Sequence, residues 1–201
     1  MEDLFKDKAP DWDAHPIPKA ISAGVGAALL RAVQWSPNME ILDFGAGTGL
    51  IAAHVAPMVK RLWAVDVSAS MLEKLKAKAE LADRVETVRQ DIMTKPLTRT
   101  FDGIVSAMAM HHVQDSKQLF ERFYEHVAPG GFVALADLDQ EDGSFHPADI
   151  EGVYHKGFER EALAELMTQA GFVNPVFETA VTLEKEGREY PVFLVTARKP
   201  A

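Results

Sequence analysis

The ten residues ILDFGAGTGL, Ile41 to Leu50, decide how the rest of the chain is interpreted. A short apolar run leads into three glycines at alternate positions, Gly45, Gly47 and Gly49. Glycine lets the backbone turn tightly and lets another group approach it closely. A strand that ends in such a loop, with a helix beginning near Thr48, indicates an open α/β sheet with a ligand beside the loop.

Four further apolar runs have the nearly continuous pattern of strands covered on both faces of a parallel sheet. With Ile41–Phe44, the predicted strands are Leu62–Val65, Val85–Val88, Phe101–Ala107 and Phe132–Leu138. Apolar residues at helical spacing predict the helices Pro18–Trp35, Ser68–Ala82, Ser116–Val127 and Glu159–Ala170. Ser68 and Ser116 stand where N-caps belong, and Gly171 follows the last helix as a stop signal.

Strands and helices alternate, which predicts an α/β protein with a Rossmann-like doubly wound sheet, mostly parallel, with helices on both faces. After Gly171 two strand-like runs, Val176–Leu183 and Tyr190–Ala197, predict an antiparallel C-terminal hairpin at one edge of the sheet. We expect residues 1–201 to form a single domain, with a helical cap over 1–36. An irregular insert over 139–157 is expected to cover the active site.

Composition limits the kinds of partner that this protein is expected to bind. The chain of 201 residues has a net charge of −9 and no cysteine. Its basic residues are spread out, so we expect no nucleic-acid partner. No apolar run reaches the roughly 20 residues that span a membrane, and the N-terminus lacks the apolar stretch of a signal peptide. These features favour a cytoplasmic protein without a membrane partner, either a monomer or a homodimer.

Two acidic residues add to the glycine loop. Asp66 ends the second strand, where an acid can bind both hydroxyls of a ribose, and Asp91 follows the third strand. The dinucleotide fingerprint G-x-G-x-x-G requires glycine at Leu50, so a nicotinamide cofactor is disfavoured. The Walker phosphate loop also fails, because no Gly-Lys-Ser/Thr follows. Close packing against a neighbouring helix stays open as the other explanation of the glycines.

Several motifs taken in order resemble those of class I S-adenosylmethionine-dependent methyltransferases. They are LDFGAGTG, Asp66, QDI, FDGIVSAMAMHHV and the APGG turn before FVALADL. The small-molecule enzymes similar to the ubiquinone and menaquinone biosynthesis methyltransferases resemble this chain most, from about Trp35 to Phe172. The resemblance implies an enzyme that moves a methyl group from S-adenosylmethionine to an oxygen, nitrogen or carbon of a small molecule, leaving S-adenosylhomocysteine.

The resemblance also implies roles for individual residues. Asp43 and the loop residues would hold the methionine part, Asp66 the ribose, Val67 and Met71 the adenine, Asp91 and Ile92 its edge, and Ala107 and Met108 the sulfonium. The loop residues are Gly45, Ala46, Gly47, Thr48 and Gly49.

The acceptor side is less specific. His111 and His112 follow the fourth strand, and either could orient or deprotonate an acceptor hydroxyl. Otherwise one would cap the next helix while the other packs in the core. Trp12, His15, His146 and His155 are expected to line the acceptor pocket, and no histidine spacing indicates a metal.

Other readings stay open. Acids around the insert (Asp137, Asp139, Glu141 and Asp142) point weakly to a cationic acceptor. A non-catalytic cofactor- or partner-binding protein is the alternative to an enzyme, followed by a nicotinamide-dependent oxidoreductase.

Overall fold

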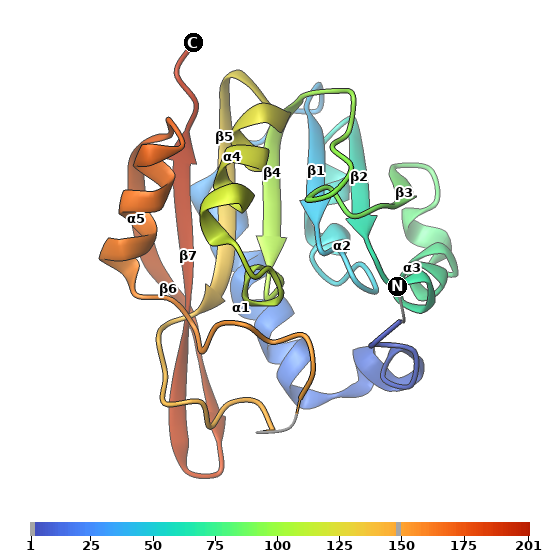
Figure 1. Cartoon of the computed structure of the whole chain (residues 1–201). Coiled ribbons are helices and arrows are strands. Elements are labelled where there is room, and N and C mark those ends of the chain that lie inside the picture. Colours follow the sequence, from blue (N-terminus) through green and yellow to red (C-terminus); the bar gives the residue numbers. More distant parts are fainter. Residues whose placement is uncertain (1–2, 148–149) are drawn as a thin grey trace.

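The computed structural model describes residues 3–147 and 150–201. The described strands form one seven-stranded sheet. Figure 1 shows helices on both faces of this sheet. The strands are β1 (Glu40–Phe44), β2 (Arg61–Asp66), β3 (Val85–Arg89), β4 (Phe101–Ala107), β5 (Val127–Leu138), β6 (Val173–Lys185) and β7 (Arg188–Arg198). Their order is β3-β2-β1-β4-β5-β7-β6. β1 to β5 run parallel, whereas β7 is antiparallel to both β5 and β6. The predicted fold class is therefore confirmed, with β7 inserted inside the sheet and β6 at its edge.

The described residues also form five α-helices and four short 3-10 helices. They are α1 (Pro16–Ala32), α2 (Ala52–Val55), α3 (Ala69–Lys76), α4 (Ser116–His126), α5 (Arg160–Gln169), η1 (Ala9–Ala14), η2 (Ala56–Met58), η3 (Ala79–Leu81) and η4 (Met110–His112). Of these, η1 and α1 precede the first strand. Within the described residues, no helix combines the length and the apolar character needed to cross a bilayer.

Alternation along each strand divides the core into two layers. Ile41 of β1 packs with α1, α2 and α3 on one face, and the next residue, Leu42, packs with α4 and α5 on the other. In the same way Val105 and Ile104 of β4 point to opposite layers. Apolar residues at successive positions are required because both faces are covered, which explains the continuous runs in the sequence.

Helix boundaries differ from the prediction at α2, α3 and α4. The Ser68 hydroxyl accepts from the Met71 amide at 3.2 Å and caps α3, as predicted. However, α3 ends at Lys76 and only a 3-10 turn continues it. The predicted cap at Ser116 is wrong, because the carboxylate of Asp115 accepts from the Gln118 amide at 2.9 Å. The helix expected near Thr48 begins only at Ala52.

The Asp115 cap gives a prediction for stability. Asp115→Ala leaves an N–H group at the start of α4 without its acceptor, which is expected to cost about 1 kcal/mol of unfolding free energy. Urea denaturation measures this loss. Lys117→Ala, on the exposed side of the same helix turn, serves as the control and should change the midpoint little. Equal effects of both substitutions would show that the cap contributes nothing.

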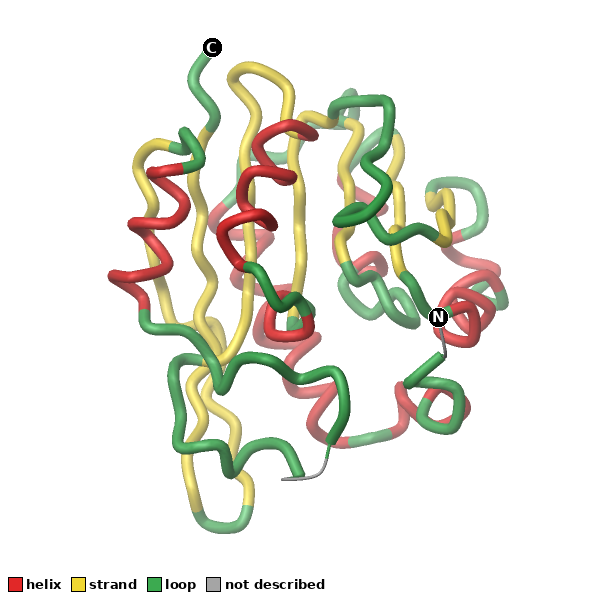
Figure 2. The backbone as a smooth tube through the Cα atoms, viewed as in Figure 1, coloured by secondary structure: helices red, strands yellow, loops and turns green. Residues whose placement is uncertain are grey.

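The carboxyl ends of the parallel strands gather at one end of the sheet. Figure 2 shows the loops after β1, β2 and β4 at this end, together with the N-terminal segment and the insert after β5. The β6–β7 hairpin extends past the sheet beside the insert. Residues 1–2 of the predicted cap and 148–149 of the predicted insert lie outside the described residues.

Candidate active site

A cavity of about 1530 Å³ lies at the carboxyl ends of the strands. Its walls come from the N-terminal segment, the glycine loop, the ends of β2 and β4, and the insert. A pocket for one drug-sized ligand measures about 300–1,000 Å³, so this volume is enough for two ligands side by side.

The glycine loop and two carboxylates form one half of the cavity. Gly45 and Gly47 have positive φ angles of 67° and 54°, which favour glycine. A side chain at Gly47 would meet no protein atom within 4 Å, so this backbone faces open space. The Asp66 carboxylate accepts from the Gly47 amide at 2.7 Å and from the Ser68 amide at 2.8 Å. The loop is thereby held against the end of β2.

Asp43 is the buried acid of this half. Only 1 % of the residue is exposed, and its Oδ2 has no hydrogen-bond partner among the described residues. Burial, and then the charge of Asp66, raise the pKa of Asp43 well above its usual value. A buried carboxylate oxygen without a donor is costly, so it marks a position where a cationic or N–H-bearing ligand would be stabilised.

Most of the predicted site residues line this cavity. They are Trp12, His15, Asp43, Gly45, Ala46, Gly47, Thr48, Asp66, Val67, Met71, Asp91, Ala107, Met108, His111, His112, His146 and His155. Gly49 and Ile92 are not among the lining residues. A side chain at Gly49 would meet Leu75 of α3 at 2.8 Å, so this glycine allows helix packing. Ile92 is 1 % exposed and packs in the core.

The N-terminal segment closes over the cavity through two acids that sequence reasoning missed. Asp3 Oδ1 accepts from the Ser68 hydroxyl at 2.8 Å, and Oδ2 accepts from the amide and hydroxyl of Ser70 at 3.0 and 2.8 Å. Asp13 accepts from the Thr48 hydroxyl at 2.5 Å. The sequence around Asp3 and Asp13 forms no recognisable motif, because their hydrogen-bond partners lie 35 to 67 residues away along the chain.

Between Asp3 and Asp13, the N-terminal segment also packs through aromatic side chains. The Phe5 ring packs edge-on against Trp12 at 6.1 Å and against His112 at 5.4 Å between ring centroids. Edge-to-face pairs of this kind contribute about 0.5–1.5 kcal/mol beyond their area burial. The segment therefore brings an apolar wall to the part of the cavity that lies beyond the glycine loop.

The attachment of Asp3 predicts how the segment responds to substitution and pH. Burial raises the pKa of Asp3, but the hydrogen bonds from Ser70 and Ser68 outweigh it and lower the pKa from 3.8 to about 2. The attachment is complete above pH 3.8 and is lost as the pH falls toward 2. Asp3→Asn should speed tryptic cleavage after Lys6 and Lys8 by about threefold or more, because the segment opens more often.

The control for this experiment is Asp11→Asn, which removes one negative charge from an exposed position of the same segment and flanks neither cleaved bond. It should leave the cleavage rate near that of the unmodified protein. In a variant with Trp35→Phe and Trp63→Phe, the fluorescence of Trp12 between pH 5 and about 2 follows the same opening. Cleavage at the same rate in both variants would contradict the role of Asp3.

His111 forms a buried pair with Asp137 at the ends of β4 and β5. The ring Nδ1 lies 2.7 Å from Asp137 Oδ1, and the His111 amide donates to Oδ2 at 3.2 Å. The two side chains are 2 % and 0 % exposed. Full burial raises the pKa of Asp137, but the charge and hydrogen bonds of His111 outweigh it and lower the pKa. Asp137 is therefore ionised and accepts the Nδ1 proton.

Three other histidines surround this pair. The His111 ring lies 4.2 Å from that of His112 and 4.9 Å from that of His146. Burial and the neighbouring His111 lower the pKa of both His112 and His146 to about 4, so both are neutral near pH 7. His112 Nδ1 donates to the Gly152 carbonyl at 2.6 Å. His155 Nε2 lies 2.9 Å from the Val113 carbonyl, which ties the insert to η4.

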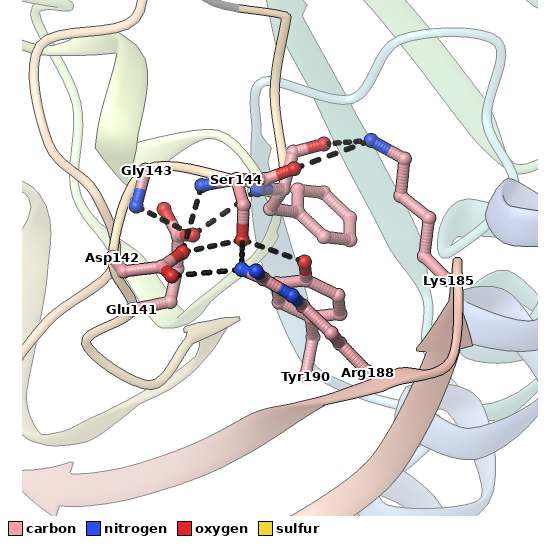
Figure 3. Close-up of polar contacts among 8 residues, drawn as sticks. Glu141, Asp142, Gly143, Ser144, Lys185, Arg188 and Tyr190 are labelled. Carbon is pink, nitrogen blue, oxygen red and sulfur yellow. Dashed lines mark hydrogen bonds and ion pairs between the residues drawn. The ribbon is translucent and has the colours of Figure 1, made fainter.

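The acids of the insert are bound within the protein, so they give no support to a cationic acceptor. Asp139 forms two hydrogen bonds of 2.7 Å with Arg160. Figure 3 shows the others: Glu141 accepts from the Gly143 amide, and Asp142 pairs with Arg188 at 2.8 Å.

The β6–β7 hairpin holds the part of the insert that reaches the cavity. The Ser144 hydroxyl lies 2.7 Å from that of Tyr190 (Figure 3). Lys185 Nζ donates to the Phe145 carbonyl at 2.7 Å. The Phe145 ring packs against the Tyr190 ring at 5.2 Å and against the His146 ring at 4.9 Å. The hairpin therefore determines where Phe145 and His146 stand.

Comparison with known proteins adds an independent finding. Residues 19–175 match a family model described as a methyltransferase domain. An uncharacterized methyltransferase of Schizosaccharomyces pombe is 31 % identical over 154 residues, which cover 68 % of this chain and 54 % of that protein. An O-methyltransferase of Pyrenophora dematioidea is 30 % identical over 72 % of this chain and 58 % of its own length. This chain spans about half the length of the curated relatives it matches.

Among solved structures, the N-methyltransferase NodS of Bradyrhizobium japonicum, in complex with S-adenosyl-L-homocysteine, superposes with a TM-score of 0.74. The match covers 99 % of this chain and 95 % of that protein at 18 % identity, so it concerns the fold.

Proposed function

This chain belongs to the methyltransferase-domain family, and from that premise we propose that it transfers a methyl group from S-adenosylmethionine to a small-molecule acceptor. The observation that carries the proposal is the orphaned carboxylate oxygen of Asp43 beside the open backbone of Gly47. An α-ammonium group would supply the missing donor and compensate the buried charge. The residues present therefore fit the cofactor.

The proposed cofactor residues lie at the ends of different strands, and each group would hold a different part of the cofactor. Asp43 and the loop from Gly45 to Thr48 would hold the methionine part, and Asp66 the ribose hydroxyls. Val67 and Met71 would border the adenine, Asp91 would meet its edge, and Ala107 and Met108 would face the sulfonium. We leave Gly49 and Ile92 out of this set because neither lines the cavity.

The bound cofactor supplies an electrophilic methyl carbon with a neutral thioether as its leaving group. The protein then contributes mainly by position. Holding two reactants in line can offset roughly 7–11 kcal/mol of the barrier. The strand-end loops would fix one reactant, and the N-terminal segment, with Phe5 and Trp12, would exclude water from the other side.

The acceptor proposed at this stage is a small molecule that presents oxygen, nitrogen or carbon. Relatives with an O-methyltransferase name and fold neighbours with an N-methyltransferase name support the two heteroatoms equally. The size of the cavity supports a second ligand beside the cofactor.

Calorimetry tests the cofactor proposal directly. Purified protein is titrated with S-adenosylmethionine, S-adenosylhomocysteine and NADH in turn. We expect one site for each sulfur compound and no heat from NADH. Binding of NADH alone would favour an oxidoreductase. Cofactor binding without methyl transfer to any acceptor in a broad panel would instead favour a binding protein.

A further inference from the structure

The His111–Asp137 pair leaves one basic nitrogen at the cavity. Asp137 is ionised and lies 2.7 Å from Nδ1, so in the neutral ring Nδ1 carries the proton and Nε2 carries the lone pair. No hydrogen bond to Nε2 is found among the described residues, and His111 lines the cavity. A histidine held by a carboxylate in this tautomer is arranged to accept a proton and to keep the resulting charge compensated.

His112 is a poor base. Its lowered pKa of about 4 means that it holds a proton weakly near pH 7. Its Nδ1–H donates to the Gly152 carbonyl, and its ring packs against Phe5. These contacts make His112 a wall of the acceptor space, so the two histidines that the sequence could not rank have different roles.

The rings around the pair are aromatic, and the charge among them, that of Asp137, is buried and hydrogen-bonded by His111 and the Leu138 amide. Of the charged side chains elsewhere in the lining, Lys8, Asp115, Glu151 and Glu159 are exposed to solvent. Neutral His112 and His146 flank His111, with the rings of Phe5 and Phe145 beside them. Glu141 and Lys185 influence His146 with opposite signs, so their fields oppose each other there. A charged acceptor would lose its hydration in this space without gaining an unbound partner among these residues.

We infer that the acceptor is an uncharged, mostly apolar molecule with an ionisable hydroxyl, such as a phenol or an enol. His111 accepts the proton of this hydroxyl, and Asp137 positions the His111 ring. This inference rests on the proposed methyl transfer. As the acceptor oxygen bonds to the methyl carbon, the carbon–sulfur bond breaks and its electron pair stays on sulfur. The hydroxyl proton moves to Nε2 of His111 and later passes to water.

Four compounds with one ring system test the acceptor class. They are 2-naphthol, 2-naphthalenethiol, 2-naphthoate and the (2-naphthylmethyl)ammonium ion, each assayed with saturating S-adenosylmethionine. Mass spectrometry identifies the methylated product. We expect the naphthol and the thiol to be methylated, and the two charged compounds to react at least tenfold more slowly. Preferential turnover of a charged compound would overturn the inference, as would no turnover of naphthol while S-adenosylhomocysteine still binds.

The role of His111 is tested by comparing the turnover of an oxygen acceptor, the naphthol, with that of a sulfur acceptor, the aryl thiol. Asparagine can keep the donor to Asp137 while lacking Nε2, so His111→Asn should lower naphthol turnover by about 10²- to 10⁴-fold. An aryl thiol ionises readily near neutral pH and needs no base, so its turnover should fall less than tenfold. Unchanged binding of S-adenosylhomocysteine confirms that the variant is folded.

The matched comparison is His112→Gln, which alters the wall without removing the proposed base. It should lower naphthol and thiol turnover to a similar extent. Equal losses on the two acceptors in His111→Asn would mean that His111 only shapes the pocket. Absence of S-adenosylhomocysteine binding to the unmodified protein would contradict the proposed function itself, which keeps the two failures distinct.

Discussion

Naphthol turnover by Asp137→Asn is expected to fall by about 10²- to 10⁴-fold, comparable to loss of the base itself. The carboxylate now accepts at both oxygens: Oδ1 from the Leu138 amide and His111 Nδ1, and Oδ2 from the His111 amide. An amide has one oxygen, and in either orientation it removes the charge that compensates a protonated His111. With its NH₂ group at the Oδ1 position it would also face Nδ1, so the ring would hold its proton on Nε2, where the lone pair is required.

Steady-state kinetics on naphthol and the aryl thiol separate this effect from simple damage. The kcat for naphthol should fall, while its KM and the thiol turnover change little. Asp139→Asn is the matched control, because Asp139 pairs with Arg160 and not with a histidine. A parallel loss on both acceptors, or a normal kcat for naphthol, would contradict the positioning role of Asp137.

The second large effect concerns Asp43. Asp43→Asn should weaken the binding of S-adenosylhomocysteine by about 2–3 kcal/mol, on the order of 30- to 150-fold, because the ammonium loses a charged hydrogen-bond partner. The same change should stabilise the protein without ligand. Burial and the charge of Asp66 raise the pKa of Asp43, so ionising this carboxyl opposes folding.

The size of this gain in stability depends on pH. Asp43 has a folded pKa above its usual 3.8, so its penalty begins as the pH rises through 3.8 and is complete above the raised pKa. The gain in urea midpoint for Asp43→Asn should therefore be small at acid pH and larger near pH 7. Asp83→Asn, an exposed acid before β3, makes the same change in net charge and should alter neither quantity. Unchanged affinity in Asp43→Asn would remove Asp43 from the cofactor site.

Local patterns in the sequence were enough to predict most of the fold. Continuous apolar runs predicted the strands, helical spacing predicted the helices between them, and the change of rhythm after Gly171 predicted the hairpin. Ends of elements were less predictable. The cap of α4 is Asp115 because its carboxylate reaches the Gln118 amide, and neighbouring Asp115 and Ser116 offer similar capping chemistry in sequence.

The same limit applies to the site. Most predicted residues line one cavity, because the loops that follow parallel strands meet at one edge of the sheet. Gly49 is different: it stands in the glycine loop, yet its close neighbour is Leu75 of α3. A glycine that faces a ligand and a glycine that faces a helix have the same local sequence signal, and only the position of the helix separates them.

The sequence by itself determined the succession of strands and helices along the chain and the loop at Gly45 and Gly47, since these depend on the spacing of neighbouring residues. It also placed His111 and His112 after the fourth strand, but it could not rank them. The tertiary structure decided that His111 has a carboxylate partner, because β4 and β5 lie side by side and bring Asp137 within 2.7 Å across 26 positions of the chain. A contact of that kind depends on strand order and register, which no local pattern records.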